Sequence, residues 1–227
     1  MSEKKKQVKR IFDSIAYRYD FLNHLLSFGT DYYWRRKAIK YSGMNENSIL
    51  LDVACGTGDF AITAHNAGVK NIYGADLSYK MLKLFNSKAE WIKGCSVEMV
   101  AEFLPFKDSS FTNITVAFGV RNFYDIPKAF SSFRSVLKPN GKVTILEFRL
   151  PKNIFFKVLY KFYFTRILPL IGNLISRDKE AYIYLPESVH EFDEKINLKE
   201  LLEQADFSKV DTKSLTFGIV QVVIATK

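Results

Sequence analysis

The stretch LLDVACGTGDFA, residues 50–61, decides the fold class of this chain. Its first residues form an apolar run typical of a buried strand, and a helix-periodic pattern follows its two glycines, Gly56 and Gly58. A Gly-x-Gly-x-x-Ala order between a strand and a helix matches the loop with which α/β proteins bind dinucleotides. The stretch therefore predicts a strand, a ligand-binding loop and a helix of an α/β sheet.

The carboxylates around this loop indicate the kind of ligand. Asp52 and Asp59 flank the glycines, so a pyrophosphate would face negative charge, whereas an ammonium or sulfonium centre would be stabilised. Asp76 ends the next apolar run, where it is placed to hydrogen-bond a ribose diol. Capping of the following helix is the alternative explanation for Asp52 and Asp59. We expect S-adenosylmethionine as the ligand and keep NAD as the second candidate.

The sequence on both sides of the loop extends the same pattern. Short apolar runs alternate with helix-periodic stretches, which predicts a parallel sheet with helices on both faces. The expected strands are 48–53, 71–75, 97–100, 112–118 and 142–148, and the expected helices are 58–66, 78–85 and 125–137.

The two ends of the chain depart from this alternation. Residues 5–41 predict two or three helices, interrupted at 27–30. Residues 151–185 look helical and aromatic, and 196–205 form an amphipathic helix. Two strand-like runs, 209–213 and 216–226, have no crossover between them, so we expect them to pair antiparallel.

Composition limits the functional classes. The 227 residues suit one domain, and 33 Lys and Arg against 24 Asp and Glu give a net charge of +9, which favours acidic partners such as nucleic acid or anionic lipid. Cys55 and Cys95 have no second cysteine or histidine at metal-ligand spacing, so we expect neither a disulfide framework nor a metal site. No long apolar core follows the basic start MSEKKKQVKR, so we expect a cytoplasmic protein without a signal peptide or transmembrane helix.

Seven separate motifs are spread along the chain: FDSIAYRYDFLNHLLSFGTDYYWRR (12–36), LDVACGTGDF (51–60), AEFLPF (101–106), FGVRNFYD (118–125), VLKPNGKVTILEF (136–148), YIYLPESVHEF (182–192) and LTFGIVQ (215–221). In these motifs the chain resembles the ubiquinone/menaquinone biosynthesis C-methyltransferase family. The first, fourth and sixth are specific to that family, whereas the second and fifth are shared with many class I methyltransferases.

The resemblance implies a fold and an activity. The expected fold is α/β, a Rossmann-like seven-stranded class I methyltransferase sheet in the order 3-2-1-4-5-7-6 with strand 7 antiparallel. Within a single domain it implies an N-terminal helical cap (1–43), a cofactor-binding core (44–150), a helical lid (151–192) and a closing helix and strand pair (193–227). The implied reaction is S-adenosylmethionine-dependent C-methylation of a prenylated quinol ring, with demethylmenaquinol as the leading acceptor.

The resemblance also places the cofactor site, with Thr57 and Asp76 on family binding positions. Two positions depart from the family pattern. Val100 stands where an acidic or amide side chain usually contacts adenine, a departure that a short deletion in this loop would explain equally well, and Ala117 replaces a serine. Adenine recognition is therefore expected at the backbone near Ala101. The expected cofactor-binding residues are Asp52, Gly56, Thr57, Gly58, Asp76, Leu77, Ala101 and Ala117.

The chemistry of C-methylation indicates the catalytic candidates. A ring carbon becomes nucleophilic as an adjacent phenol loses its proton, so a cation or base near that oxygen accelerates the reaction. Arg121 can stabilise a phenolate, although its high pKa makes it an implausible base. Asn122 can orient the ring oxygen and Tyr184 can relay a proton; a surface ion pair is the alternative for Arg121.

Other residues of the family-specific motifs remain unranked. The expected acceptor-binding residues are Tyr19, Asn23 and Phe118. Tyr17, Asp20, Glu187 and His190 are further proton-relay candidates, and Glu147 is either a strand-end cap or a site carboxylate. His24 and His65 are expected to be structural.

The segment 154–169 mixes large apolar residues with Lys157, Lys161 and Arg166. A basic aromatic helix of this kind can lie at a lipid headgroup surface, roof a tunnel for an isoprenoid chain, or belong to the core. We expect loose contact with the inner face of the cell membrane, and a homodimer is compatible with the sequence. A methyltransferase of RNA or of a small phenol, and a catalytically silent scaffold, are the alternatives. Without a basic accessory domain, no nucleic-acid partner is expected.

Overall fold

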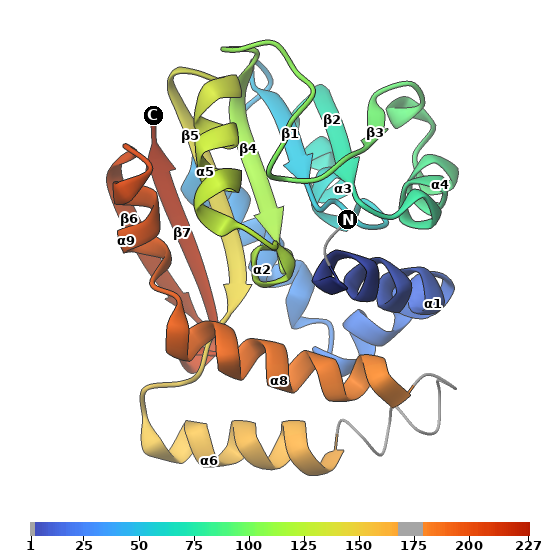
Figure 1. Cartoon of the computed structure of the whole chain (residues 1–227), viewed down its shortest axis with the longest axis vertical. Coiled ribbons are helices and arrows are strands. Elements are labelled where there is room, and N and C mark those ends of the chain that lie inside the picture. Colours follow the sequence, from blue (N-terminus) through green and yellow to red (C-terminus); the bar gives the residue numbers. More distant parts are fainter. Residues whose placement is uncertain (1–2, 168–178) are drawn as a thin grey trace.

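The computed structural model describes residues 3–167 and 179–227. Within them, seven strands form one sheet in the order β3-β2-β1-β4-β5-β7-β6 (Figure 1). The pairs from β3 to β5 are parallel, whereas β7 runs antiparallel to both β5 and β6. The expected strand order and the expected antiparallel pair at the end of the chain are therefore confirmed. The strands are β1 (Ile49–Val53), β2 (Asn71–Asp76), β3 (Ser96–Glu98), β4 (Phe111–Ala117), β5 (Leu137–Phe148), β6 (Ser208–Leu215) and β7 (Val220–Thr226).

Strand β5 begins earlier than the expected start at residue 142. Phe111 of β4 pairs with Leu137, and after a register shift Asn113 pairs with Lys142. Residues 138–141, between Leu137 and Lys142, carry the turn sequence Lys-Pro-Asn-Gly. Asn140 has φ +61°, a left-handed conformation that asparagine tolerates. The turn residues therefore form an irregularity of the strand rather than a separate loop.

Helices surround the sheet, and short side chains begin several of them. The Ser78, Asp125 and Asn153 side chains each accept a hydrogen bond from a backbone N–H of the first turn, which satisfies a donor that the helix leaves free. Gly29, at φ +71°, separates the first two helices, so residues 5–41 form two helices and not three. The helices are α1 (Glu3–Leu26), α2 (Thr30–Ser42), α3 (Asp59–Asn66), α4 (Tyr79–Lys88), α5 (Ile126–Val136), α6 (Ile154–Phe162), α8 (Lys179–Lys195) and α9 (Leu198–Gln204), with short turns at η1 (Glu90–Ile92), η2 (Val120–Asn122), η3 (Tyr163–Ile167) and η4 (Thr216–Gly218).

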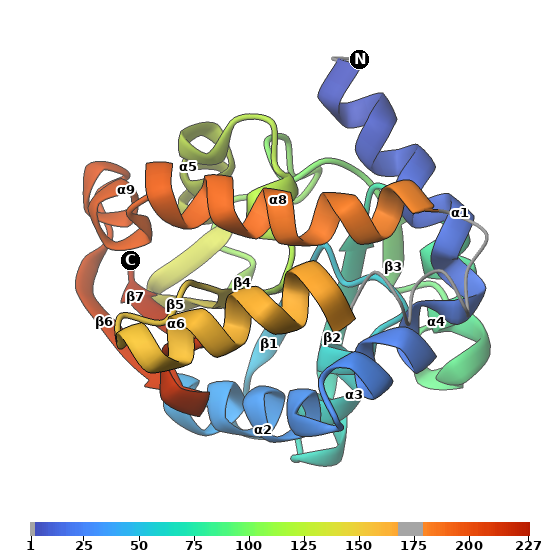
Figure 2. The ribbon, with the colours of Figure 1, turned by 90° about the horizontal axis from the view of Figure 1, so that it is seen from below.

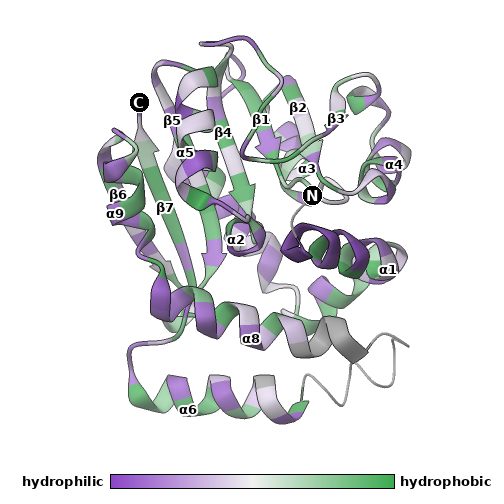
Figure 3. Cartoon of the chain, viewed as in Figure 1, coloured by the Kyte–Doolittle hydropathy of each residue, from purple (hydrophilic) through white to green (hydrophobic). Residues whose placement is uncertain are grey.

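The hydrophobic core lies on the two faces of the sheet. One cluster packs α5 and α9 against one face, and a second packs α2, α3 and α4 against the other. Leu50 and Leu51, neighbours in β1, belong to different clusters, because successive side chains of a strand point to opposite faces. The predominance of hydrophobic residues along strands such as β7 is visible in Figure 3.

A third group of helices closes the edge of the sheet at which the parallel strands end. Helices α1, α6 and α8 lie below this edge in Figure 1, and in the view from below α6 lies between α8 and α2 (Figure 2). Buried Ile11, Leu22, Tyr160 and Val189 join these helices into a separate apolar cluster. Within the described ranges, none of the helices is both long enough and apolar enough to cross a membrane.

Candidate functional site

A first cavity, cavity A, lies at the carboxyl ends of β1, β2 and β4, beneath α1. This is the edge at which open α/β sheets bind ligands. Residues of α1 form one wall, including Phe12 and Tyr19. Five of the eight expected cofactor-binding residues line cavity A: Gly56, Asp76, Leu77, Ala101 and Ala117.

Asp76 and Glu102 are carboxylates in the lining of cavity A, and Asp76 is the one at the end of strand β2. Its Oδ2 accepts a hydrogen bond from the Gly56 backbone N–H (2.8 Å), and its Oδ1 accepts one from the Ser78 N–H (2.8 Å). Burial raises the pKa of Asp76 above its ordinary value. A carboxylate has lone pairs beyond these two bonds, so a fixed acceptor remains for a diol, as the sequence predicts.

Asp52 has a different environment from the one expected. Its side chain is buried, and its Oδ1 accepts a hydrogen bond from Thr115 Oγ1 of β4 at 2.7 Å. Among the described residues, Asp52 is not part of the lining of cavity A. Desolvation by burial raises the pKa of Asp52 to about 7. Asp52 therefore lies in the sheet interior against Thr115, outside the described lining of cavity A.

Thr57 and Gly58 also lie outside the described lining of cavity A. The Thr57 hydroxyl donates a hydrogen bond to Asp20 of α1. Gly58 has φ +88°, and a Cβ built on it would lie 2.0 Å from Cδ2 of Phe85. Glycine is needed here so that the loop can pack closely on α4.

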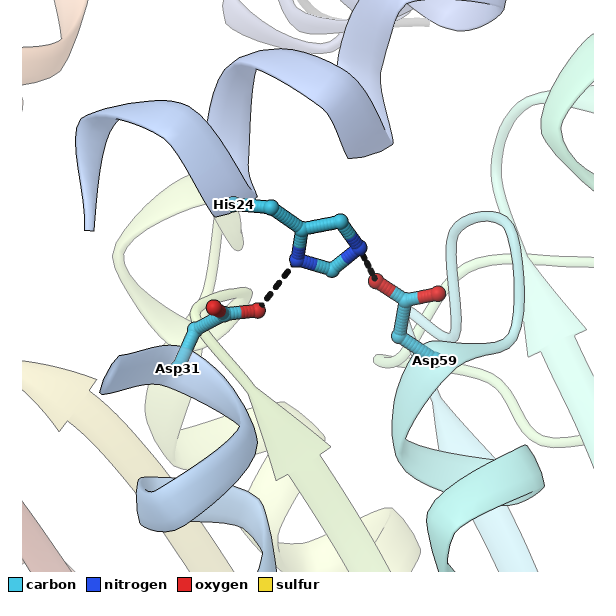
Figure 4. A group of neighbouring side chains, drawn as sticks. All are labelled: His24, Asp31 and Asp59. Atoms are coloured by element: carbon cyan, nitrogen blue, oxygen red, sulfur yellow. Dashed lines mark hydrogen bonds and ion pairs between the residues drawn. The ribbon is translucent and has the colours of Figure 1, made fainter. Parts of the chain in front are cut away.

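Asp59 belongs to a salt-bridge network with the N-terminal helices (Figure 4). Nδ1 of His24 lies 2.7 Å from Oδ2 of Asp31, and Nε2 lies 3.7 Å from Oδ2 of Asp59. Arg35 pairs with both carboxylates, and Lys88 Nζ lies 2.8 Å from Asp20 and 2.7 Å from Asp59. Because Arg35 and Lys88 already pair with these carboxylates, we interpret the cluster as a network that joins α1 and α2 to the glycine loop, and not as a metal site. The expectation that Asp59 faces the ligand is not supported by this arrangement.

A second and larger cavity, cavity B, has a volume of about 520 Å³ and lies between α1, α2, α6 and the end of β5. Its walls are largely apolar, with Trp34, Phe148, Phe156 and Leu159 among them. Phe12, Tyr19 and Phe118 line both cavities. The two cavities therefore meet at these three aromatic side chains.

Polar groups gather where the cavities meet. Arg121 and Tyr184 line cavity B and Asn122 lines cavity A, and the Tyr184 hydroxyl donates a hydrogen bond to Asn122 Oδ1 at 2.7 Å. Arg121 is not in a surface ion pair, because its side chain is buried and Nη1 lies 2.8 Å from Oε1 of the fully buried Glu147. The structure thus brings all three catalytic candidates together.

The structure also separates the unranked candidates. Tyr19 and Asn23, two of the predicted acceptor-binding residues, line cavity B. Tyr17 is 82% exposed, and Glu187 and His190 are exposed as well. These three side chains are outside the described lining of either cavity.

Some residues that line the cavities were not predicted from the sequence. Asp31 and Arg35 line cavity B, and their presence in a family-specific motif was the available signal. Val100 and Ala117, the two departures from the family pattern, both line cavity A without a polar side chain. Glu102 has a structural role, because its Oε1 accepts hydrogen bonds from the Tyr124 and Asp125 backbone N–H groups.

Comparison with known proteins gives matches over the full length. The sequence profile of the ubiE/COQ5 methyltransferase family matches residues 1–227. A ubiquinone/menaquinone biosynthesis C-methyltransferase UbiE of Geotalea daltonii is 43% identical over 233 residues, covering 100% of this chain and 99% of the relative. A demethylmenaquinone methyltransferase of Bacteroides fragilis is 39% identical over 231 residues, covering 99% of this chain and 94% of the relative.

Solved structures of more distant proteins share the fold. Phosphoethanolamine N-methyltransferase 2 of Haemonchus contortus, in complex with S-adenosyl-L-methionine, has a TM-score of 0.69 at 15% identity and covers 100% of this chain and 60% of its own. A SAM-dependent methyltransferase of Aquifex aeolicus has a TM-score of 0.60 at 17% identity, covering 85% and 88%. At these identities the likeness concerns the fold alone.

Proposed function

Because the chain belongs to the ubiE/COQ5 methyltransferase family, we propose that it methylates a ring carbon of demethylmenaquinol to give menaquinol. It is an S-adenosylmethionine-dependent C-methyltransferase of quinone biosynthesis, as its relatives' names indicate. The observation that carries the proposal is the meeting of cavities A and B at Tyr19 and Phe118. A methyl donor in one cavity and a long apolar acceptor in the other would have their reacting ends side by side.

The residues of cavity A fit the cofactor. Asp76 offers carboxylate oxygens to a ribose diol, and Leu77, Met99 and Ala101 give the apolar walls that a flat base needs. When bound, S-adenosylmethionine supplies a methyl group made electrophilic by the positive sulfur. The chain's own contribution is to hold and orient the two reactants and to exclude water, since displacement at a methyl carbon requires no covalent protein nucleophile.

The residues of cavity B fit a prenylated quinol. Its apolar walls suit an isoprenoid chain, and its polar end, with Arg121 and Tyr184, suits the ring oxygens. Desolvation raises the pKa of Tyr184, so this phenol stays neutral and orients the acceptor by hydrogen bonding. Arg121 stays protonated. Its positive charge stabilises the negative charge on the acceptor oxygen as the adjacent ring carbon attacks the methyl group.

Product analysis tests this proposal. The protein is incubated with methyl-labelled S-adenosylmethionine and, separately, a short-chain demethylmenaquinol, the corresponding demethylated benzoquinol, or RNA, and the products are analysed by mass spectrometry. We expect the label on the naphthoquinol ring. Label on the benzoquinol alone would move the acceptor class to ubiquinone precursors, and label on RNA would contradict the proposal, as would no transfer at all.

We further propose that helix α6 rests on the surface of an anionic lipid bilayer. Exposed apolar side chains extend along this helix, with Ile154, Phe155 and Val158 between 62% and 74% exposed. Lys152, Lys157 and Lys161 are exposed beside them, which suits anionic headgroups. Figure 3 shows apolar and polar residues mixed along α6 at the outer edge of the molecule.

Part of the lining of cavity B is exposed at the protein surface. Phe28, Phe162 and Phe217 line cavity B, yet they are 78%, 55% and 69% exposed. A prenylated acceptor would therefore reach cavity B past these exposed aromatic side chains, one of which, Phe162, belongs to α6.

Flotation with lipid vesicles tests the contact. We expect the protein to float with vesicles of phosphatidylglycerol and phosphatidylcholine, and the Phe155→Ser/Val158→Ser variant to remain in the aqueous fraction. The matched control is Tyr79→Ser, at a similarly exposed aromatic residue of α4, which should float. Equal flotation of all three proteins, or of none, would contradict the role given to α6.

A further inference from the structure

Glu147 lies at the reaction end of the sheet although it is fully buried. It follows Leu146, which pairs with Ala117 at the carboxyl end of β4, and its side chain has no exposed surface. A carboxylate in such a place is stable only if it is paired and hydrogen-bonded. Its partner is Arg121, which lines cavity B.

The contacts of Arg121 fix one side of its guanidinium group. Nη1 donates hydrogen bonds to Glu147 Oε1 (2.8 Å) and to the Phe118 carbonyl oxygen. The Arg121 backbone N–H points at Glu147 Oε2 (3.4 Å), and the guanidinium carbon lies 5.9 Å from the centre of the Phe148 ring. Nε of Arg121 is buried without a hydrogen-bond partner in the described part of the chain. Glu147 thus holds one side of the guanidinium group, whereas Nε has no hydrogen-bond partner among the described residues.

The negative charge of Glu147 also reduces the net positive charge that Arg121 presents to cavity B. Burial by itself would lower the pKa of Arg121, but the Glu147 carboxylate and the nearby Tyr184 and Tyr19 keep it above its ordinary value. Seen from cavity B, the Arg121–Glu147 pair is close to neutral. An acceptor oxygen at the part of Arg121 that lines cavity B would meet an oriented guanidinium group and a partly balanced positive charge, not a bare cation.

We propose that Glu147 is a positioning residue for the methyl transfer, which fixes Arg121 at the polar end of cavity B and sets how strongly its charge stabilises an ionised ring oxygen. The proposal rests on the proposed function for the identity of the acceptor as a phenol. An ion pair that acts on folding but lies too far from the acceptor to influence it would leave the ionisation of a bound phenol unchanged, so the two roles can be separated.

The decisive experiment titrates a bound phenol. The probe is 4-nitro-1-naphthol, whose ionised form absorbs visible light, added to the protein with S-adenosylhomocysteine present. In Glu147→Gln the amide oxygen can still accept the Arg121 hydrogen bond, but the negative charge is gone. A like charge raises the pKa of a nearby acid, so removal of the Glu147 charge should lower the pKa of the bound naphthol by about one unit relative to the unaltered protein.

A second variant keeps the proposal testable if Glu147→Gln does not fold. Glu147→Asp retains the negative charge but shortens the side chain. The hydrogen bonds that hold Arg121 in place are therefore lost, although the opposite charges remain. We expect kcat to fall by roughly tenfold or more, as for other small displacements of a positioning group, with the KM for S-adenosylmethionine unchanged. Restoration of glutamate should restore kcat.

The outcomes separate the two proposals. An unchanged naphthol pKa in folded Glu147→Gln, or an unchanged kcat in Glu147→Asp, would overturn the role of Glu147 and leave the proposed function standing. Failure of the naphthol to bind even the unaltered protein would contradict the phenol acceptor, and the role of Glu147 with it. A lowered naphthol pKa together with reduced kcat supports both.

Discussion

Replacing Asp52 by asparagine should remove a pH-dependent loss of stability from this protein. Desolvation raises the pKa of Asp52 in the folded state to about 7 from an ordinary value of 3.8. The folded protein therefore holds this proton more strongly than the unfolded chain does. The stabilisation from the bound proton is complete below about pH 4 and is lost as the pH rises through about 7.

The magnitude follows from the two pKa values. Linkage gives a loss of about 1.5–2 kcal/mol by about pH 5 and about 4 kcal/mol by about pH 8, so roughly 2–3 kcal/mol is lost between these pH values. Asparagine has no such proton, and its amide oxygen can keep the hydrogen bond from Thr115. The free energy of unfolding of Asp52→Asn, relative to the unaltered protein, should therefore rise by that amount between about pH 5 and about pH 8.

Urea unfolding at several pH values, without cofactor, measures this difference. Other titrating groups are common to both proteins and cancel in the comparison. Asp211→Asn is the control, because it makes the same chemical change at an exposed position of β6. A pH-independent difference for Asp52→Asn, or one of the opposite sign, would refute the reasoning that burial governs this carboxylate.

Three further predictions concern the site. Asp76→Ala should weaken S-adenosylmethionine binding in calorimetry by about 1.5–3 kcal/mol for each charge-assisted hydrogen bond lost, and unchanged binding would remove Asp76 from the cofactor site. Arg121→Ala should lower kcat far more than it changes the affinity for the cofactor; equal turnover would exclude Arg121 from the mechanism. Gly58→Ala should lower the free energy of unfolding by about 1–3 kcal/mol, because a Cβ would meet the Phe85 ring at 2.0 Å and the backbone conformation is strained for alanine. A thermal unfolding midpoint equal to that of the unaltered protein would show that the loop adapts.

Part of the site was predictable because it depends on chain order. Asp76 and Arg121 each follow a predicted parallel strand, and the carboxyl ends of parallel strands meet at one edge of the sheet. Both residues do lie there, beside the cavities. The pairing of Arg121 with Glu147 was less accessible, although a carboxylate inside the apolar run VTILEF was a signal of a buried partner.

The direction of individual side chains was not predictable in the same way. Tyr17 and Tyr19 are two residues apart on α1, and a helix turns by ~200° over that interval; one is exposed and the other lines both cavities. Asp59 has a place in the sequence that suits a ligand contact, yet Lys88 and Arg35, brought by other helices, pair with it. Such outcomes depend on which helix packs where.

The sequence by itself determined the α/β class, the strand alternation and the edge that carries the site, because hydrophobic periodicity and chain order are local properties of the chain. Only the tertiary structure decided the environments of the charged groups: Asp52 beside Thr115 in the sheet interior, Asp59 in a salt-bridge network, and Arg121 held by Glu147. A carboxylate's charge and hydrogen-bonding depend on burial and on partners distant in sequence. Packing, and not the motif, decided which of the acids Asp52, Asp59 and Asp76 lines cavity A.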